Sequence, residues 1–395
     1  MSWRDGVVYQ IYPRSFCDSN GDGVGDLAGI RSKLDYLEEL GVDAVWLSPI
    51  FPSPMADYGY DVADYRDVDP MFGTLDEFDA LLDDLHARGI RLLLDFVPCH
   101  TSIEHPWFTE HPDWYIWADG TDGGPPNNWV AAFGGSAWTY HEERGRWYLH
   151  SFYPEQPDLD WHNPEPVAAM QDALRFWMDR GVDGFRIDAI DRIMKDPELR
   201  DDPPRTEPFG LPLNPEEERL ALTHSRNGPG TEQALKKIRD AVGPDAFLVG
   251  EVYLPADRVG PYLEHFDRFF AFELLFAPWE PEAIRAAIDA VNAEARRDGT
   301  GPAWVMSNHD FGWLASRVGR ENVEEALALL LGLPGTVFLY QGDEFGMENG
   351  PDTRGDRFGR DAFRTPIPWD RVVGNPILAR TKALVAERHK FMCQK

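Results

Sequence analysis

The sequence predicts an α/β protein in which eight parallel strands close into a (β/α)8 TIM barrel, and three observations support this fold class. The chain has 395 residues, of which 43% are hydrophobic. This composition suits one large core, and the length is greater than that of an average single domain unless the fold is a barrel. Short apolar runs alternate with segments of helical periodicity, the order that produces a parallel sheet. Eight such runs occur, and eight βα units close a sheet into a barrel.

The eight apolar runs are interpreted as buried strands. They are expected at residues 7–12, 42–47, 90–97, 182–188, 247–251, 268–274, 303–308 and 336–341. Near-continuous apolar character is typical of parallel strands that are covered on both faces. The runs therefore predict strands inside the barrel wall.

Helices between these strands carry start and stop signals. Thr74 and Glu77 form a capping box, Asn163 followed by Pro164 begins another helix, and Gly41 ends the first one. Helices are expected at residues 27–40, 74–89, 163–181, 232–242, 281–297, 321–331 and 375–390.

Two connections are too long to be simple loops. Residues 101–162 follow the third strand, are rich in Trp, Pro and Gly, and predict a small inserted domain. Residues 190–231 follow the fourth strand, are rich in Pro and charge, and predict a partly ordered lid. Both leave the C-terminal ends of strands, where barrel active sites lie. The expected organisation is a barrel of residues 1–100 and 163–390, an insert of residues 101–162 and a tail of residues 391–395, with no C-terminal β-sandwich.

The composition of the chain indicates which classes of partner the protein can bind. The net charge of −30 should repel nucleic acid and anionic membranes, so a neutral small molecule is the expected partner. Cys17, Cys99 and Cys393 are too few and too scattered for a disulfide framework or a zinc site. The first residues lack a signal-peptide pattern and no apolar run reaches membrane-span length. We therefore expect a cytoplasmic protein with no membrane partner. No feature of the sequence specifies an oligomeric state.

Polar residues cluster at four of the predicted strand ends. The segments are 95–100, 184–189, 250–252 and 307–310, and they carry His100, Arg186, Asp188, Glu251, His309 and Asp310. Because barrel strands end at one face, these side chains should converge. Arg186 lies two residues before Asp188, on the same strand face, and is expected to hold it ionised.

A pair of carboxyls, one ionised and one protonated, is what glycosidic bond cleavage requires. The apolar run before Glu251 and the two neighbouring carboxylates should keep that residue protonated. A retaining mechanism needs the two carboxyls about 5 Å apart, which adjacent strands four and five can provide. The alternative interpretation is a set of ordinary buried ion pairs. Three carboxylates and two histidines at four strand ends argue against it.

A second oxygen-rich signal follows the first strand. Asp18, Asn20, Asp22 and Asp26 alternate along the chain, and the Val24 carbonyl is available between them. This spacing resembles an EF-hand loop and predicts a structural Ca²⁺ or Mg²⁺ site. The alternative is a solvated acidic turn.

The strand-end motifs and the Gln156-Pro157-Asp158-Leu159 segment resemble the conserved regions of the α-amylase family, glycoside hydrolase family thirteen. More narrowly, residues 9–16, 156–159 and 364–366 resemble the α-glucosidase and oligo-1,6-glucosidase branch. The resemblance extends to about Asp370. It implies a retaining, exo-acting α-glucosidase that releases α-1,4-linked glucose from the non-reducing end of maltose-like oligosaccharides, with Ca²⁺ or Mg²⁺ in the loop at residues 18–26.

The resemblance also implies a role for each matching residue. Asp188 matches the nucleophile, Glu251 the general acid/base, and Asp310 the carboxylate that grips sugar hydroxyls. The implied substrate-binding residues are Asp57, Tyr60, His100, Phe133, Gln156, Arg186, Ala189, His309 and Arg360. Within this set, Asp57, Tyr60 and Arg360 are expected to close the terminal-glucose pocket, and Ala189 to help choose between α-1,4 and α-1,6 linkages.

The sequence departs from the family pattern at Cys99, where Asn is usual, so an amylase-type calcium site is not expected there. Residues 311–313 replace a segment that often contains Pro-Arg. Three other functions stay open: a sucrose- or trehalose-acting glucosyltransferase or isomerase, a non-catalytic sugar-binding relative, and an endo-acting amylase. The last requires an open cleft, whereas Asp57, Tyr60 and Arg360 predict a blind pocket.

Overall fold

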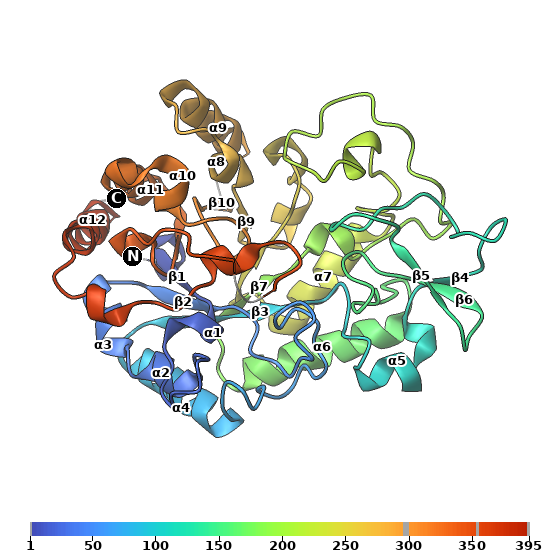
Figure 1. Ribbon diagram of the computed structural model, residues 1–395, viewed down its shortest axis with the longest axis horizontal. Coiled ribbons are helices and arrows are strands. Elements are labelled where there is room, and N and C mark those ends of the chain that lie inside the picture. The colour runs from blue at the N-terminus through green and yellow to red at the C-terminus, as the bar shows by residue number, and fades with distance from the viewer. Residues whose placement is uncertain (1, 295–299, 353–354, 393–395) are drawn as a thin grey trace.

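In the computed structural model, which describes residues 2–294, 300–352 and 355–392, eight parallel strands form a closed barrel (Figure 1). The pairing of Val7 on the first strand with Val337 on the last closes the sheet. The strands around the barrel are β1 (Val7–Ile11), β2 (Ala44–Leu47), β3 (Arg91–Phe96), β7 (Gly184–Ile187), β8 (Phe247–Gly250), β9 (Arg268–Phe270), β10 (Gly301–Trp304) and β11 (Thr336–Tyr340). The predicted fold class is confirmed.

Helices cover the outside of the barrel (Figure 1). The longer ones are α4 (Leu75–Ala87), α6 (Pro164–Asp179), α7 (Thr231–Val242), α9 (Pro281–Ala293), α11 (Val323–Gly332) and α12 (Pro376–Met392); shorter ones are α1 (Pro13–Phe16), α2 (Leu27–Arg31), α3 (Leu34–Leu40), α5 (Pro106–Glu110), α8 (Phe272–Phe276) and α10 (Leu314–Val318). The expected caps form: Thr74 accepts from the Glu77 amide and Asn163 from the Glu165 amide. Among the described residues, no helix combines the length and apolar character needed to span a bilayer.

Several predicted boundaries differ from the structure. The helix expected at 27–40 is broken into α2 and α3, because the Ser32 hydroxyl bonds the Gly29 carbonyl at 2.6 Å and competes with continued helix. The strand expected at 268–274 ends at Phe270 and is followed by α8, since an apolar run alone does not distinguish strand from helix. The strand expected at 303–308 lies instead at Gly301–Trp304.

The ends of two predicted segments involve undescribed residues. The helix expected at 281–297 ends at Ala293, and residues 295–297 lie outside the described part of the chain. The expected tail at 391–395 begins inside α12, which continues to Met392. Residues 393–395 of that tail also lie outside the described residues.

Two long segments leave the barrel at strand ends. Between β3 and α6, the strands β4 (Trp117–Ala118), β6 (Arg146–Leu149) and β5 (Trp138–His141) form a small antiparallel sheet, on the side of the molecule away from both termini (Figure 1). The second segment, residues 190–230, follows β7. It is tied to the first by hydrogen bonds from Trp129 Nε1 to the Arg200 carbonyl and from Asn128 Nδ2 to the Asp202 carbonyl, both 2.9 Å.

Aromatic side chains fill the barrel beneath its C-terminal face. The Trp46 ring lies 5.7 Å from that of Phe270 and 5.9 Å from that of Phe338. Trp46 also meets the His309 ring edge-on at 5.9 Å. This apolar layer forms the floor on which the polar strand-end residues stand, and it removes them from bulk water.

Candidate active site

A cavity of about 380 Å³ opens at the C-terminal ends of the barrel strands, within the size range of small-molecule sites. Nine of the predicted catalytic and binding residues line it: Asp57, Tyr60, His100, Phe133, Asp188, Ala189, Glu251, Asp310 and Arg360. The other three, Gln156, Arg186 and His309, contact these residues from behind. The structure therefore brings all twelve together.

Arg186 lies at the centre of the acidic cluster. Its Nη1 is 2.5 Å from Asp188 Oδ1 and 2.8 Å from Asp95 Oδ1, and its Nη2 is 2.9 Å from Glu251 Oε2. The Ala189 amide also donates to Glu251 Oε2 at 2.9 Å. One buried guanidinium thus serves three carboxyl groups, although the sequence predicted it only as the partner of Asp188.

This shared cation leaves the cluster with excess negative charge. Burial raises the pKa of Asp188 well above its ordinary value; Arg186 opposes that rise, while Glu251 and Asp95 add to it. Burial likewise raises the pKa of Asp95 to about 6. The expectation that Arg186 alone keeps Asp188 ionised was therefore incomplete. Three carboxyls around one guanidinium favour retention of one proton among them.

His309 is held as a neutral imidazole with a defined tautomer. Burial lowers its pKa well below the ordinary value. Gln10 Nε2 donates to Nδ1 at 2.8 Å, so the proton lies on Nε2. That nitrogen faces Tyr60 Oη at 2.5 Å and Asp310 Oδ2 at 3.2 Å. Tyr60 in turn donates to Asp95 Oδ2 at 2.9 Å, which links the histidine to the Arg186 cluster.

Two arginines hold Asp310. Arg364 Nη2 lies 2.8 Å and Arg360 Nη1 3.3 Å from Asp310 Oδ1. Although burial opposes ionisation, His309 and the two arginines hold the pKa of Asp310 far below its usual range. Asp310 is therefore an anion, in contrast to the Asp188 cluster.

Arg360 also lines the cavity, beside Asp57. Its Nη2 is 2.6 Å from Asp57 Oδ1, and its guanidinium stacks 5.4 Å from the Phe133 ring. The Phe133 ring packs 4.1 Å from Phe358. Gln156 Nε2 reaches Asp57 Oδ2 at 3.1 Å and His100 Nε2 at 3.0 Å. Residues far apart in sequence thus line the cavity with an ion pair and an aromatic wall.

Some site residues were not predicted. Asp95 and Arg364 lie in quoted motifs, but neither was assigned a role. A charged residue inside the apolar run 92–96 signals a buried partner, and this could have identified Asp95. Arg192, Asn214 and Glu217 line the cavity from residues 190–230, where the sequence has no periodicity to indicate which side chains point inward.

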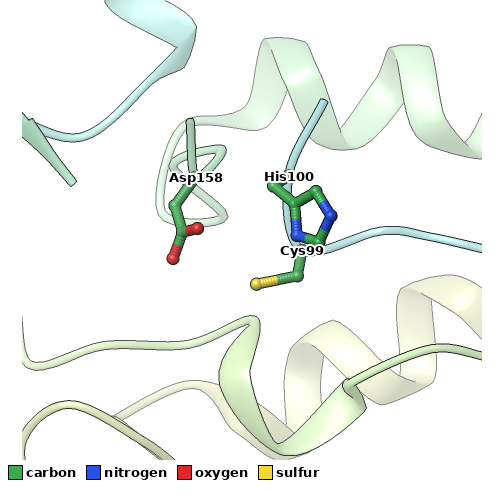
Figure 2. Close-up of side chains that lie close together, drawn as sticks. All are labelled: Cys99, His100 and Asp158. Carbon is green, nitrogen blue, oxygen red and sulfur yellow. The ribbon is translucent and has the colours of Figure 1, made fainter. Parts of the chain in front are cut away.

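Cys99, His100 and Asp158 place their potential ligand atoms within 4.8 Å of one another (Figure 2). The buried Lys195 ammonium, however, lies 2.6 Å from Asp158 Oδ2 and 3.6 Å from Cys99 Sγ. A divalent ion would meet that positive charge. Burial also raises the pKa of Cys99 to about 12 and keeps it a thiol, a poor metal ligand. The cluster is thus an internal ion pair and does not fit a metal.

The acidic loop at residues 18–26 folds around its own side chains. Asp18 accepts from the Gly21 and Gly23 amides at 2.6 and 2.8 Å, both glycines having positive φ. These amides, Gly23 first, lower the pKa of Asp18. Asp26 caps α2 by accepting from the Gly29 amide. The all-oxygen donors suit Ca²⁺ or Mg²⁺, but the three carboxylates of this fully described loop do not gather within 4.8 Å. Asn20 and the Val24 carbonyl would have to complete the set.

Comparison with known proteins agrees with this geometry. The family model described as alpha amylase, catalytic domain, matches residues 10–383. The alpha-glucosidase of Culex pipiens is 41% identical over 396 residues, covering 93% of this chain and 67% of the relative. The oligo-1,6-glucosidase of Parageobacillus thermoglucosidasius is 40% identical over 379 residues, covering 88% and 66%. The chain thus spans about two thirds of the length of these relatives.

Solved structures show the same similarity. The alpha-glucosyl transfer enzyme XgtA superposes with a TM-score of 0.87 at 38% identity, covering 98% of this chain and 81% of that one. A trehalulose synthase MutB variant superposes with a TM-score of 0.89 at 31% identity, covering 99% and 85%.

Proposed function

The chain belongs to the alpha-amylase family of glycoside hydrolases, and we propose that it is a retaining, exo-acting α-glucosidase that releases α-1,4-linked glucose from the non-reducing end of maltose-like oligosaccharides. The relatives named alpha-glucosidase, maltase and oligo-1,6-glucosidase support this activity. The observation that carries the exo-acting part is the ion pair between Asp57 and Arg360.

This ion pair blocks the cavity beyond the first sugar. Arg360 is buried, and it bridges Asp57 at 2.6 Å and Asp310 at 3.3 Å. An endo-acting enzyme must let a polysaccharide run past the reacting bond on both sides. A cavity closed by a buried ion pair and the Phe133 ring admits only the terminal glucose.

The side chains supply the groups that a two-step retaining reaction needs. Asp188 would attack the anomeric carbon, and Glu251 would protonate the departing oxygen and then deprotonate water. Asp310, held anionic by Arg360 and Arg364, would accept hydrogen bonds from sugar hydroxyls that strengthen in the transition state. Neutral His309, whose Nε2 faces Tyr60 and Asp310, would position Asp310 for these contacts from behind the cavity lining.

The loop at residues 18–26 is proposed to hold one structural Ca²⁺ or Mg²⁺. Asp18, Asn20, Asp22, Asp26 and the Val24 carbonyl would supply its oxygens. Such an ion would neutralise part of the negative charge of the three carboxylates in this loop. None of these residues lines the cavity, so the ion's role would be stability. A cytoplasmic location is proposed from the free thiols Cys17 and Cys99; cell fractionation tests it.

Glucosyl transfer is the second candidate, because solved relatives are named as an alpha-glucosyl transfer enzyme and a trehalulose synthase. The same covalent intermediate on Asp188 would be attacked by a sugar hydroxyl in place of water. The two activities therefore share the first step and differ in the acceptor.

Product analysis distinguishes these activities. The protein is incubated separately with maltose, isomaltose, sucrose and trehalose, and the products are identified by chromatography and NMR. We expect glucose from maltose, released first as the α-anomer. Rearranged disaccharides from sucrose would assign the transferase activity, and no product from any of the four would contradict both.

A further inference from the structure

We propose that Arg192 binds the hydroxyl groups of the departing sugar and that Glu217 positions it. This assigns the leaving-group side of the cavity to a neutral, polyhydroxylated group, and it rests on the proposed glucosidase activity. The two residues lie at the start and in the middle of the segment 190–230 that follows β7.

The position of the leaving group follows from the two ends of the cavity. One end is sealed by the Asp57–Arg360 ion pair, so the terminal glucose lies there. Glu251 must face the departing oxygen in order to protonate it. The departing sugar is therefore placed on the remaining side, to which we assign the lining residues Ala132, Arg192, Leu213, Asn214, Glu217 and Tyr253.

Arg192 is fixed against this side of the cavity. It ends a short 3-10 helix (Ile190–Arg192) that begins after Ala189. Its guanidinium stacks 5.3 Å from the Phe152 ring, and that ring packs 5.2 Å from His100. The stacking leaves the edge of the guanidinium, where its donors lie, free to point along the cavity.

Among the residues that the structure describes, the guanidinium of Arg192 uses one edge for hydrogen bonding. Nη2 donates to Glu217 Oε1 at 2.8 Å. In the described part of the chain Nε and Nη1 have no hydrogen-bond partner, and they are not among the fully buried unpaired atoms. Arg192 thus offers accessible donors beside the place where a sugar must leave.

Glu217 is the anchor for this arrangement. Arg226 donates to its Oε1, and Asn214 Nδ2 donates to its Oε2 at 3.0 Å. Burial acts against ionisation, but Arg226 and Arg192 keep the pKa of Glu217 below its ordinary value. Because both carboxylate oxygens of Glu217 already accept hydrogen bonds from these donors, it orients Arg192 and does not itself need to contact substrate.

Charge balance indicates the chemistry of the ligand. The two guanidiniums of Arg192 and Arg226 are matched by Glu217 and by Asp191, whose Oδ2 lies 3.4 Å from Arg226. The site has no excess positive charge for a phosphate or carboxylate. Hydrogen-bond donors in a site whose charges balance suit the hydroxyl groups of a neutral sugar, here a second hexose.

The test compares two substrates that share the terminal glucose and differ in the leaving group. The leaving group of maltose is glucose, whereas that of 4-nitrophenyl α-glucoside is 4-nitrophenol, which has no sugar hydroxyls. We expect Arg192→Met to lower kcat/KM for maltose about 10–100-fold, the effect of losing a hydrogen bond to a charged group, and to lower it by less than about 3-fold for the aryl glucoside. Glu217→Gln should produce a smaller loss with the same selectivity, seen mainly in KM for maltose.

Arg200→Met is the matched control, because Arg200 is an exposed arginine of the same segment, pairs with Asp196 and does not line the cavity. It should leave both substrates unchanged. Equal losses on both substrates for Arg192→Met, or no loss on maltose, would overturn the assignment of Arg192. Should that variant fail to fold, Arg192→Lys, which keeps a cation opposite Glu217 but loses the second donor edge, is judged by the same comparison. A wild-type protein inactive on both substrates overturns the proposed glucosidase activity itself.

Discussion

Arg186 Nη2 lies 2.9 Å from Glu251 Oε2, so the predicted partner of the nucleophile also contacts the predicted acid/base. This contact has a consequence for the reaction. In the proposed reaction Asp188 would lose its negative charge on becoming an ester, and Glu251 would gain one by donating its proton. The total charge around Arg186 would then be unchanged, because the guanidinium would exchange one anionic neighbour for another.

The first prediction concerns the nucleophile. Asp188→Asn removes the attacking charge but almost no volume, so turnover of maltose should fall by about 10⁴-fold or more while the melting temperature changes little. NMR of the wild-type reaction should show α-glucose as the first product. Initial release of β-glucose would contradict a retaining mechanism.

The second prediction concerns pH. The proposed nucleophile Asp188 must be ionised to attack, and burial together with the neighbouring negative charges, Asp95 among them, raises its pKa. Activity should therefore be lost on acidification at a pH above the ordinary Asp value of about 4. Asp95→Asn removes one of those charges and frees Arg186 for Asp188, which lowers the Asp188 pKa. The acid limb of kcat/KM should then move to lower pH.

A matched control for this shift is available at Asp343. Burial raises the pKa of this carboxyl to about 7, but it bonds Ser307 and does not contact Arg186. Asp343→Asn should leave the acid limb in place. An acid limb that moves to higher pH in Asp95→Asn would contradict the shared-cation account.

The third prediction concerns the loop at residues 18–26. Removal of divalent ions with EDTA should lower the melting temperature by about 2–6 °C, the effect of losing a few kcal/mol of ligand stabilisation. The rate at low temperature should change little, since the loop does not line the cavity. Asp22→Ala should abolish the EDTA effect. Protein purified with added Ca²⁺ that contains no metal by elemental analysis would contradict this site.

The fourth prediction concerns the internal ion pair. Lys195→Met leaves Asp158 buried without its 2.6 Å partner, and breaking a buried pair in this way costs about 3–5 kcal/mol of unfolding free energy. Urea denaturation measures the loss. The double variant Lys195→Met/Asp158→Asn should recover part of it, because no buried charge is left unpaired. If the double variant is as unstable as the single one, the ammonium does not act by compensating Asp158.

The fifth prediction concerns linkage. Ala189 lies beside Glu251 and lines the cavity, so Ala189→Val should shift the kcat/KM ratio from maltose toward isomaltose, by an amount corresponding to about 1–3 kcal/mol. Ala189 has φ 43° and ψ 40°, where a β-branched side chain is strained, so the variant should also lose about 1–2 kcal/mol of stability. Ala189→Gly relieves that strain without adding bulk. It should be stable and keep the wild-type preference.

Much of the architecture follows from local patterns. Apolar runs, the capping box at Thr74 and the Asn163 cap are local signals, and they predicted eight barrel strands, two of them with wrong bounds, and most helices. The errors in the predicted boundaries also have local causes. Ser32 breaks a helix through one side-chain hydrogen bond, and the apolar run at 268–274 satisfies strand and helix equally well, so packing against the rest of the molecule decides between them.

The acidic and basic residues at the strand ends were likewise evident in the sequence, because a barrel brings its strand ends to one face. Apart from the pair of Arg186 with Asp188, most of their partners were not. Arg186 is shared among Asp95, Asp188 and Glu251, Lys195 pairs with Asp158, and Glu217 holds Arg192. Periodicity and burial depend on neighbours along the chain, whereas an ion pair depends on distances of a few ångströms between residues tens of positions apart. Only the folded chain determines those distances, and with them which carboxyl keeps its proton.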